Sequence, residues 1–348
     1  MRKKILIVGP GTKTSNGGIA EVTKQMLGSD ILREDFRLYE YPSYKEGNKI
    51  SRFIYGVKRI LKFQFEARNY DAVHVQMTSK GSALRKSYYI KKAKKMGKKV
   101  FVQIHSTDFF LDTMSEKRKK KMKKTLKMAD KVLVLSDGFA DRIESEFGLE
   151  NTEVLPNGIE PYKYSYNPAA DKKKLLFLGK IREDKGCFKI IYALKLLKDT
   201  YGLEPECVIS GSGNIQEVQE EAEQLELKNI SFTGWIDGDE KTRLLKNSGV
   251  LLMPSYHEGF PMSILEGMAS GCYIITSDVG ACSEMAEGSV VMPGDEKSLA
   301  DAIKHVIYMP EDEYVAVLLK NKDKIDNVYN IDKVHKMLLD MYNDAFCN

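Results

Sequence analysis

Residues 250–288 read VLLMPSYHEGFPMSILEGMASGCYIITSDVGACSEMAEG and contain a strand, a loop, a helix and a second strand in order. The apolar run 250–253 is typical of a buried parallel strand. Apolar residues then recur at helical spacing after Pro261, which is well placed as the first helical residue. Gly271 is expected to end this helix, and residues 273–275 predict the next strand. The stretch therefore predicts half of a nucleotide-binding α/β unit.

The start of this helix is the anion site that we expect. A helix beginning near Pro261 points unpaired N–H groups and the positive end of its dipole beyond the end of the preceding strand. A diphosphate is stabilised in such a place, and we expect Gly259, Phe260 and Pro261 to bind it. Glu266 lies one turn into the helix, within reach of a ribose. Glu258 lies on the loop, nearer to the far substituent of the diphosphate.

The two glutamates and their surroundings carry a family resemblance. Glu258-Gly-Phe-Pro, a second glutamate eight positions on, and the segment 280–284 together resemble the signature of the large retaining glycosyltransferase family 4. The resemblance implies an α/β chain of the GT-B fold, in which two Rossmann-like domains face each other across a cleft. Tyr273 stands where the family often has proline and Gly267 where it often has alanine. Both departures are peripheral to the chemistry.

Length and composition describe a globular chain large enough for two domains, with 348 residues of which 43% are hydrophobic. No stretch reaches the roughly 18 apolar residues of a membrane helix, and no cleavage pattern follows the short apolar run 5–8. Five cysteines without metal or redox spacing lie at positions 187, 207, 272, 282 and 347. Their odd number suits a reducing compartment, so we expect a cytoplasmic protein.

The domain plan follows from turn residues and from the resemblance. A turn at 156–158 closes a first, acceptor-binding domain at 1–160, and a polar, tyrosine-rich linker covers 161–174. The nucleotide-sugar-binding domain is predicted at 175–330. The resemblance implies that a final helix, at 331–348, packs back on the first domain.

Charge is distributed unevenly along the chain. Residues 1–170 hold 34 Lys and Arg against 19 Asp and Glu, a net charge of +15, whereas the remainder has a net charge of −10. Lysine-rich runs at 91–99 and 117–124 supply 13 of the 34 basic residues of this half. It suggests an anionic partner, either the inner face of the plasma membrane or a polyanionic substrate. Nucleic acid fits less well, because no nucleic-acid-binding motif accompanies the charge.

A basic amphipathic helix is predicted at 50–67. Its apolar residues near one helical face are Ile50, Phe53, Ile54, Val57, Ile60, Leu61 and Phe65. Such a helix can lie in a membrane interface, or it can face the core with a basic solvated side. We favour the core-facing interpretation, because every surface helix of an α/β domain has an apolar stripe.

Two features of the first domain are candidates for ligand contact. Gly17 and Gly18 precede a helix and allow close approach of backbone to phosphate, although they equally suit a plain turn. Neither a P-loop nor a G-x-G-x-x-G fingerprint is present. His105 follows the strand 100–104, at the edge where ligands collect in parallel sheets, although a lone histidine is more often structural. In the resembling family, the glycine pair contacts the donor diphosphate and the histidine contacts the transferred sugar.

The second domain adds two cations after its first strand, 175–178. Arg182 can chelate phosphate oxygens and Lys185 can supply a point charge, although either could instead form a surface salt bridge with residues 183–184. The resemblance implies that both bind the diphosphate, and that the backbone of Ile236 contacts the base. The segment 237–239, Asp-Gly-Asp, looks like a metal motif. It precedes a helix, however, where aspartates cap, so we expect neither a metal nor another cofactor.

The resemblance implies a metal-independent, retaining transfer of a hexose or N-acetylhexosamine from a nucleotide diphosphate sugar, with UDP favoured. The acceptor is a hydroxyl, and we expect a glycan or lipid-linked glycan of surface or extracellular polysaccharide synthesis. Glu258, His105, Arg182 and Lys185 are the expected catalytic residues. Two rivals remain: an epimerase of the nucleotide sugar, and a non-catalytic partner of an active transferase. A nicotinamide dehydrogenase is contradicted by the missing glycine fingerprint.

Overall fold

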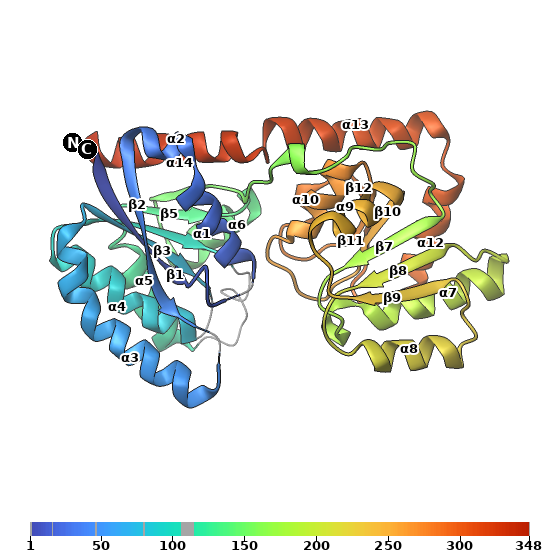
Figure 1. The fold of residues 1–348 in the computed structure, drawn as a ribbon, viewed down its shortest axis with the longest axis horizontal. Coiled ribbons are helices and arrows are strands. Elements are labelled where there is room, and N and C mark those ends of the chain that lie inside the picture. Colours follow the sequence, from blue (N-terminus) through green and yellow to red (C-terminus); the bar gives the residue numbers. More distant parts are fainter. Residues whose placement is uncertain (1, 16, 46, 79–80, 106–114, 348) are drawn as a thin grey trace. The chain divides into compact units, whose positions relative to one another are not determined.

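Figure 1 shows the fold in a computed structural model, which describes residues 2–15, 17–45, 47–78, 81–105 and 115–347. The chain divides into two compact units. Unit 1 comprises Met1–Gly158 and Ile331–Asn348, and unit 2 comprises Ile159–Asn330. Each unit contains a six-stranded sheet whose paired strands are parallel, with helices around it. The predicted α/β class with two Rossmann-like domains is confirmed.

The sheet of unit 1 has the order β2-β1-β3-β4-β5-β6. Its strands are β1 (Lys3–Pro10), β2 (Phe36–Tyr44), β3 (Ala72–Met77), β4 (Lys99–Ile104), β5 (Lys131–Val134) and β6 (Thr152–Val154). Its helices are α1 (Gly18–Gly28), α2 (Asp30–Asp35), α3 (Lys49–Glu66), α4 (Gly81–Lys95), α5 (Glu116–Leu126), α6 (Asp137–Phe147) and α14 (Ile331–Cys347). The strand order reverses between β1 and β3, which is where such sheets offer a crevice to ligands.

The last helix, α14, packs on unit 1 through an aromatic cluster. Tyr342 lies 4.7 Å from Phe101 and 5.3 Å from Phe36, ring centre to ring centre, in edge-to-face contacts. Its hydroxyl donates to Nδ1 of His74, 2.7 Å away, while Nε2 of His74 donates to Oε1 of Gln103 at 3.2 Å. Because both ring nitrogens have partners that suit a neutral imidazole, the buried histidine is satisfied without charge.

Helix α3 forms where the sequence predicts it, but its orientation contradicts the favoured core-facing interpretation. The large apolar side chains of the predicted face are mostly exposed, whereas Gly56 and Phe63 are buried. The guanidinium of Arg59 lies on the inner side, 3.7 Å from the ring centre of Tyr41. The cation–π contact lets an arginine stem fill the inner face, so the apolar stripe points outward.

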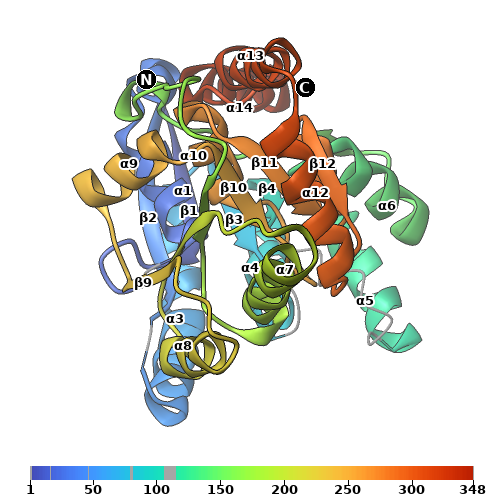
Figure 2. The ribbon, with the colours of Figure 1, turned by 90° about the vertical axis from the view of Figure 1, so that its right-hand side faces the viewer.

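The sheet of unit 2 has the order β12-β11-β10-β7-β8-β9. Its strands are β7 (Lys174–Leu178), β8 (Glu206–Ser210), β9 (Ile230–Gly234), β10 (Val250–Met253), β11 (Tyr273–Ser277) and β12 (Gly288–Val291). Its helices are α7 (Cys187–Tyr201), α8 (Ile215–Gln224), α9 (Gly238–Asn247), α10 (Met262–Ser270), α11 (Cys282–Met285), α12 (Glu296–Tyr308) and α13 (Glu311–Asn327). Figure 2 shows α7 and α12 beside each other, where their buried side chains join one core.

The stretch that decides the fold behaves largely as predicted. Strand β10 is buried at every position, and Gly271 ends α10 in the left-handed conformation with a φ of 87°. Pro261 occupies the N-cap with a ψ of 119°, so its prediction as the first helical residue was wrong by one position. A Cβ on Gly267 would lie 2.8 Å from Leu251, which explains a glycine where α10 crosses the sheet.

The predicted linker, 161–174, lies within unit 2 and begins with the 3-10 helix η3 (Pro161–Lys163). In the part of the chain that the structure describes, no helix is both long enough and apolar enough to cross a bilayer.

Candidate functional site

The candidate site lies where the strand order of unit 2 reverses, between β7 and β10. A cavity of about 390 Å³ opens there, within the range of small-molecule sites. It is lined by Phe177, Leu178, Gly179, Lys180, Arg182, Lys185, Met253, Glu258, Pro261 and Ser263. The last residues of both strands, the loops that follow them and the start of α10 supply these residues, so the carboxyl ends of adjacent parallel strands form the site.

Glu258 and Lys185 meet in this cavity. The ammonium of Lys185 lies 2.7 Å from Oε1 of Glu258 and donates to the carbonyl of His257 at 2.9 Å. The hydroxyl of Ser255 donates to the same carboxylate oxygen at 2.8 Å. The side chains of Glu258 and Lys185 are 14% and 18% exposed, so their attraction is screened less than that of a surface pair. The contact fixes the position of both groups.

Three loops interlock to hold this pair in place. Gly186 has a φ of 74°, and a Cβ there would lie 2.1 Å from the carbonyl oxygen of Pro254. Gly280 has a φ of 61°, and its Cβ would lie 2.4 Å from the carbonyl oxygen of Glu258. The amide of Ala281 donates to the carbonyl of Gly259 at 3.0 Å. Only glycine permits both the conformation and the approach, so these two positions set the spacing of the loops.

Arg182 lies at the rim of the cavity and is 51% exposed. Its guanidinium pairs with the carboxylate of Asp184, two residues along the chain. The surface salt bridge that was the alternative for this residue is therefore present. Such exposed pairs are weak, so the arginine can exchange this partner for an anion.

The start of α10 presents its backbone to the cavity. Pro261 and Ser263 line it, and the ring of Phe260 packs edge-to-face on Tyr329 with ring centres 5.8 Å apart. Phe260 is buried, and the carbonyl of Gly259 is already used by Ala281. These contacts fix the path of the chain into the helix, whose first amides are the anion-binding groups expected from the sequence.

Glu266 has two partners that sequence reasoning missed. The ammonium of Lys241, on α9, lies 2.7 Å from Oε1 of Glu266, and the hydroxyl of Tyr164 donates to the same oxygen at 3.2 Å. The carboxylate is 14% exposed, as little as that of Glu258. No local pattern links residues 25 and 102 positions apart. The signal that could have found them is the chemistry alone, because a half-buried carboxylate needs a cation and a donor.

Ile236 and the Asp-Gly-Asp segment lie beside α9. Ile236 is buried, which leaves its backbone as the part that can meet a ligand. Asp237 stands at the N-cap of α9, as its position in the sequence suggested, but its side chain accepts no capping hydrogen bond from the helix. Across the described ranges, no group of three or more His, Cys, Asp or Glu side chains is arranged to hold a metal ion.

The candidates in unit 1 lie at the carboxyl ends of its strands. His105 follows β4, and its Nε2 donates to Oε1 of Gln76 on β3. Burial lowers the pKa of His105 to about 3, with smaller contributions from His74 and Lys86. The imidazole is therefore neutral near pH 7, with Nδ1 as its acceptor. Its free Nδ1 can accept a hydrogen bond from a hydroxyl, but the ring carries no positive charge.

Gly17 is the N-cap of α1, and Gly18 is the first residue of that helix. A Cβ at either position would meet no other atom within 4 Å. The glycines are therefore not required by packing inside unit 1. The open space is compatible with close approach of a ligand to the backbone.

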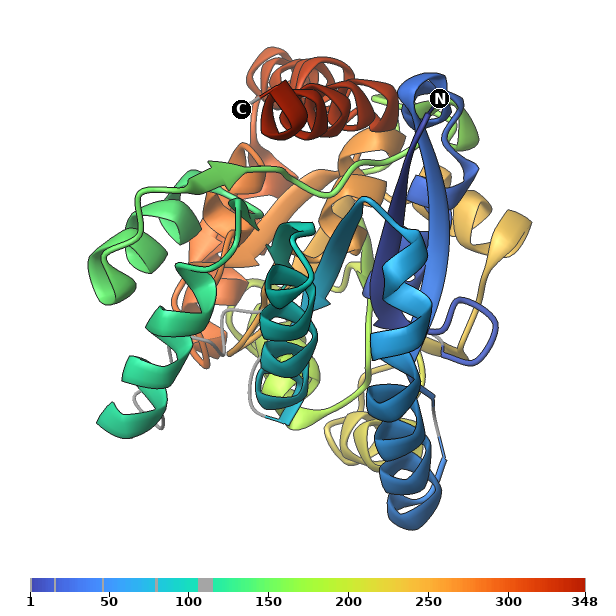
Figure 3. The same cartoon turned by 90° about the vertical axis from the view of Figure 1, so that its left-hand side faces the viewer.

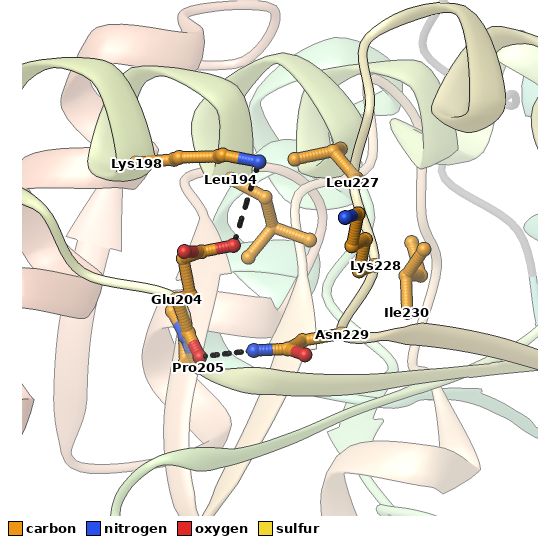
Figure 4. Close-up of a pocket in the computed structure, with 8 residues that line it drawn as sticks. All are labelled: Leu194, Lys198, Glu204, Pro205, Leu227, Lys228, Asn229 and Ile230. Carbon is orange, nitrogen blue, oxygen red and sulfur yellow. Dashed lines mark hydrogen bonds and ion pairs between the residues drawn. The ribbon is translucent and has the colours of Figure 1, made fainter.

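A second hollow in unit 2 is too small for a ligand. It lies at the opposite end of the sheet, where β8 and β9 begin, and measures about 10 Å³ (Figure 4). Lys198 pairs with Glu204 at 3.5 Å, and the side chain of Asn229 donates to the Glu204 carbonyl at 2.9 Å. A space of this size holds about one water molecule. The polar groups around it hold loops together.

Two family models match the chain, one on each half. The model described as glycosyl transferases group 1 matches residues 158–324, and the model described as glycosyltransferase family 4 matches residues 19–163. The first match covers all the site residues of unit 2. Both halves of the chain are therefore similar to glycosyltransferase families, and the two-unit architecture is the GT-B fold.

Curated proteins that are similar to this chain match about half of it. An uncharacterized glycosyltransferase of Methanocaldococcus jannaschii is 27% identical over 198 residues, which are 51% of this chain and 50% of the relative. The chain spans about half the length of the curated relatives that it matches.

Solved structures bear out the GT-B fold of this chain. Sucrose-phosphate synthase from Thermosynechococcus elongatus has a TM-score of 0.81 at 17% identity. The match covers 99% of this chain and 100% of the synthase chain. An Anabaena protein solved in complex with UDP and glucose has a TM-score of 0.77 at 15% identity, with 99% and 100% covered. At these identities the likeness shows the fold alone.

Proposed function

We propose that this protein transfers a sugar from a nucleotide diphosphate sugar to a hydroxyl acceptor, with retention of the anomeric configuration. The observation that carries the proposal is the contact of Lys185 with Glu258 in the cavity between β7 and β10. The site places a cation and a carboxylate beside the start of a helix. A diphosphate needs the cation and the start of the helix, and a sugar ring needs the carboxylate.

The diphosphate would lie against Lys185, Arg182 and the first amides of α10. Within the described residues, two of the three N–H groups of the Lys185 ammonium bind His257 and Glu258, so the third can bind a phosphate oxygen. Arg182 would exchange Asp184 for the same group. Both cations stabilise the negative charge that grows on the leaving diphosphate, which is the step where they lower the barrier.

Glu258 would hold the sugar and stabilise the positive, oxocarbenium-like carbon of the transition state. The bond between the anomeric carbon and the diphosphate oxygen breaks, and its electron pair goes to the diphosphate. The acceptor oxygen bonds to the same carbon on the same face, and its proton passes to a leaving phosphate oxygen. A separate protein base is therefore not required. His105 would contact the transferred sugar as a neutral hydrogen-bonding group.

Glu266 would bind the ribose, and the backbone of Ile236 the base. We favour UDP as the nucleotide, because the structurally similar Anabaena protein was solved with UDP and glucose. Gly17 and Gly18 would contact the donor diphosphate through their backbone. For the acceptor we propose a glycan or lipid-linked glycan of surface polysaccharide synthesis, made in the cytoplasm. The support for it is the net charge of +15 in residues 1–170.

The experiment that tests the proposal combines binding and turnover. Thermal shift with UDP-, GDP- and ADP-sugars should give the largest stabilisation with one UDP-sugar. Turnover of that donor with a panel of hydroxyl acceptors, followed by NMR, should give a product with the anomeric configuration of the donor. Donor conversion to an epimer in the absence of acceptor would instead identify an epimerase. Binding of no nucleotide sugar would leave only a non-catalytic role.

A further inference from the structure

Helix α3 carries the largest set of exposed apolar side chains on a single helix of the described chain. The exposed fractions are 73% for Ile50, 73% for Phe53, 61% for Ile54, 41% for Val57, 60% for Leu61 and 60% for Phe65. Taken at 100° per residue, these six positions fall on one side of the helix. They form a continuous apolar stripe about 22 Å long, which we call the α3 stripe. A contiguous exposed patch of this kind marks an interaction surface.

The inner side of α3 fixes the stripe in this outward direction. Phe63 packs edge-to-face on Tyr41 and Tyr89 beneath the helix, with ring centres 5.4 and 4.7 Å away. Arg59 lies over Tyr41 and pairs with Glu66 at 3.5 Å. Turning the helix inward would bury the α3 stripe only by expelling this aromatic cluster and the arginine. The exposure therefore belongs to the folded unit 1.

Charge around the α3 stripe identifies its partner. Lys58 and Lys62 are exposed on the flank of the same helix. Helices α3, α4 and α5 lie in one row on unit 1 (Figure 3), and they contact one another in that order. The last turn of α4 carries Lys92, Lys94 and Lys95, and α5 carries seven basic residues against one acidic residue. The layer is therefore apolar at one end and strongly basic along the rest.

This combination suits an anionic lipid surface better than a second copy of the chain. Two copies meeting through this face would place basic helices against basic helices, which disfavours association. Anionic headgroups neutralise the lysines, and the acyl boundary accepts the phenylalanines and isoleucines. We propose that α3 lies flat in the headgroup region of an anionic bilayer, with the α3 stripe inserted and the basic face of α4 and α5 on the headgroups.

A matched pair of leucines tests the proposal. Leu61 of the α3 stripe and Leu319 of α13 are similarly exposed, at 60% and 57%. Full-length protein is sedimented with vesicles of phosphatidylcholine containing about one third phosphatidylglycerol. We expect the double change Phe53→Ser with Leu61→Ser to lower the bound fraction at least tenfold, and Leu319→Ser to leave it unchanged. Adding salt should weaken binding of the unaltered protein.

Contrary outcomes are equally definite. Unaltered protein that fails to bind these vesicles, or a double variant that binds as well as unaltered protein, would overturn insertion by α3. Analytical ultracentrifugation gives the oligomeric state. If the unaltered protein were a dimer and the double variant a monomer, the α3 stripe would instead bind a second copy of the chain. Transfer activity is not used as a readout, so failure here is distinct from failure of the proposed reaction.

The depth of insertion can be measured because the chain has a single tryptophan, Trp235 in unit 2. In a Trp235→Phe background, Phe53→Trp and Phe65→Trp place one fluorophore near either end of the α3 stripe. Both should shift to the blue with anionic vesicles and be quenched equally by lipids brominated on the acyl chain. Quenching at one end only would contradict a helix that lies flat.

Discussion

The two units use the same edge of a parallel sheet for different chemistry. In unit 2 the carboxyl ends of the strands carry two ion pairs, Lys185 with Glu258 and Lys241 with Glu266. In unit 1 the same edge carries His105, hydrogen-bonded to Gln76 and held neutral by burial. The fold supplies the location, whereas the loops supply the charge. A charged edge suits a diphosphate, and a neutral edge suits hydroxyl groups.

The largest effect should come from removing charge from the edge in unit 2. Lys185→Ala or Glu258→Ala should lower kcat about 10²- to 10³-fold with folding intact, because each removes a group that acts on charge developing in the transition state. Steady-state kinetics with the donor found by the thermal-shift screen checks this. Circular dichroism and the unfolding temperature check the fold.

A second Lys–Glu pair in unit 2 is the control. Lys189 lies 2.7 Å from Glu296, the same separation as in the pair of the site, but neither residue lines the cavity. Lys189→Ala should leave kcat within about twofold, because such partly exposed pairs contribute little. Wild-type turnover in Lys185→Ala would refute the catalytic role of the charged edge.

The sequence predicted the edge in unit 2 well, because the information there is local. Strand β10, the loop with Glu258 and the end of α10 at Gly271 follow one another within a short stretch. The partner of Glu266 was not predictable in this way. Lys241 belongs to another helix, and only the packing of α9 beside α10 brings it to the carboxylate.

Helix α3 shows a different limit. Periodicity established that the helix is amphipathic, and the structure agrees, but periodicity does not say which side meets the protein. The deciding contacts are Arg59 on Tyr41 and Phe63 against Tyr89. These pairs join distant segments and make a partly polar side the inner one. The general rule that apolar stripes face the core failed here for that reason.

Lowering the pH should protonate buried histidine in unit 1, which removes the contrast between its neutral sheet and the charged sheet edge of unit 2. Burial lowers the pKa of His74 to about 4 from an ordinary value of 6.5. As the pH falls, His74 takes up a proton in the unfolded chain before it does so in the folded protein. The contribution of His74 to the free energy of unfolding is therefore complete above about pH 6.5 and is lost as the pH falls towards 4. The shift corresponds to about 3 kcal/mol between pH 7 and pH 4. His105 is partly buried and its pKa is also lowered, so it adds loss in the same direction.

Urea unfolding at a series of pH values measures this loss. His74→Gln should reduce the pH dependence, because a glutamine keeps polar contact with Tyr342 and Gln103 but does not titrate. His305→Gln, at an exposed position of α12, is the matched control and should not alter the dependence. An unchanged slope in His74→Gln would show that another group dominates acid unfolding.

The smallest effect should separate the two ion pairs of unit 2 from each other. Lys241 holds the carboxylate of Glu266, which we expect to bind the ribose rather than the reacting atoms. Lys241→Met should therefore raise KM for the donor about tenfold and leave kcat nearly unchanged, the pattern of lost uniform binding. Lys246→Met, in the last turn of the same helix, is the control for α9. A lower KM in Lys241→Met would mean that the lysine competes with the ribose for Glu266. An unchanged KM would mean that Lys241 does not position the carboxylate of Glu266. A fall in kcat comparable to that of Lys185→Ala would mean that both pairs, and not Lys185 with Glu258 alone, act on the transition state.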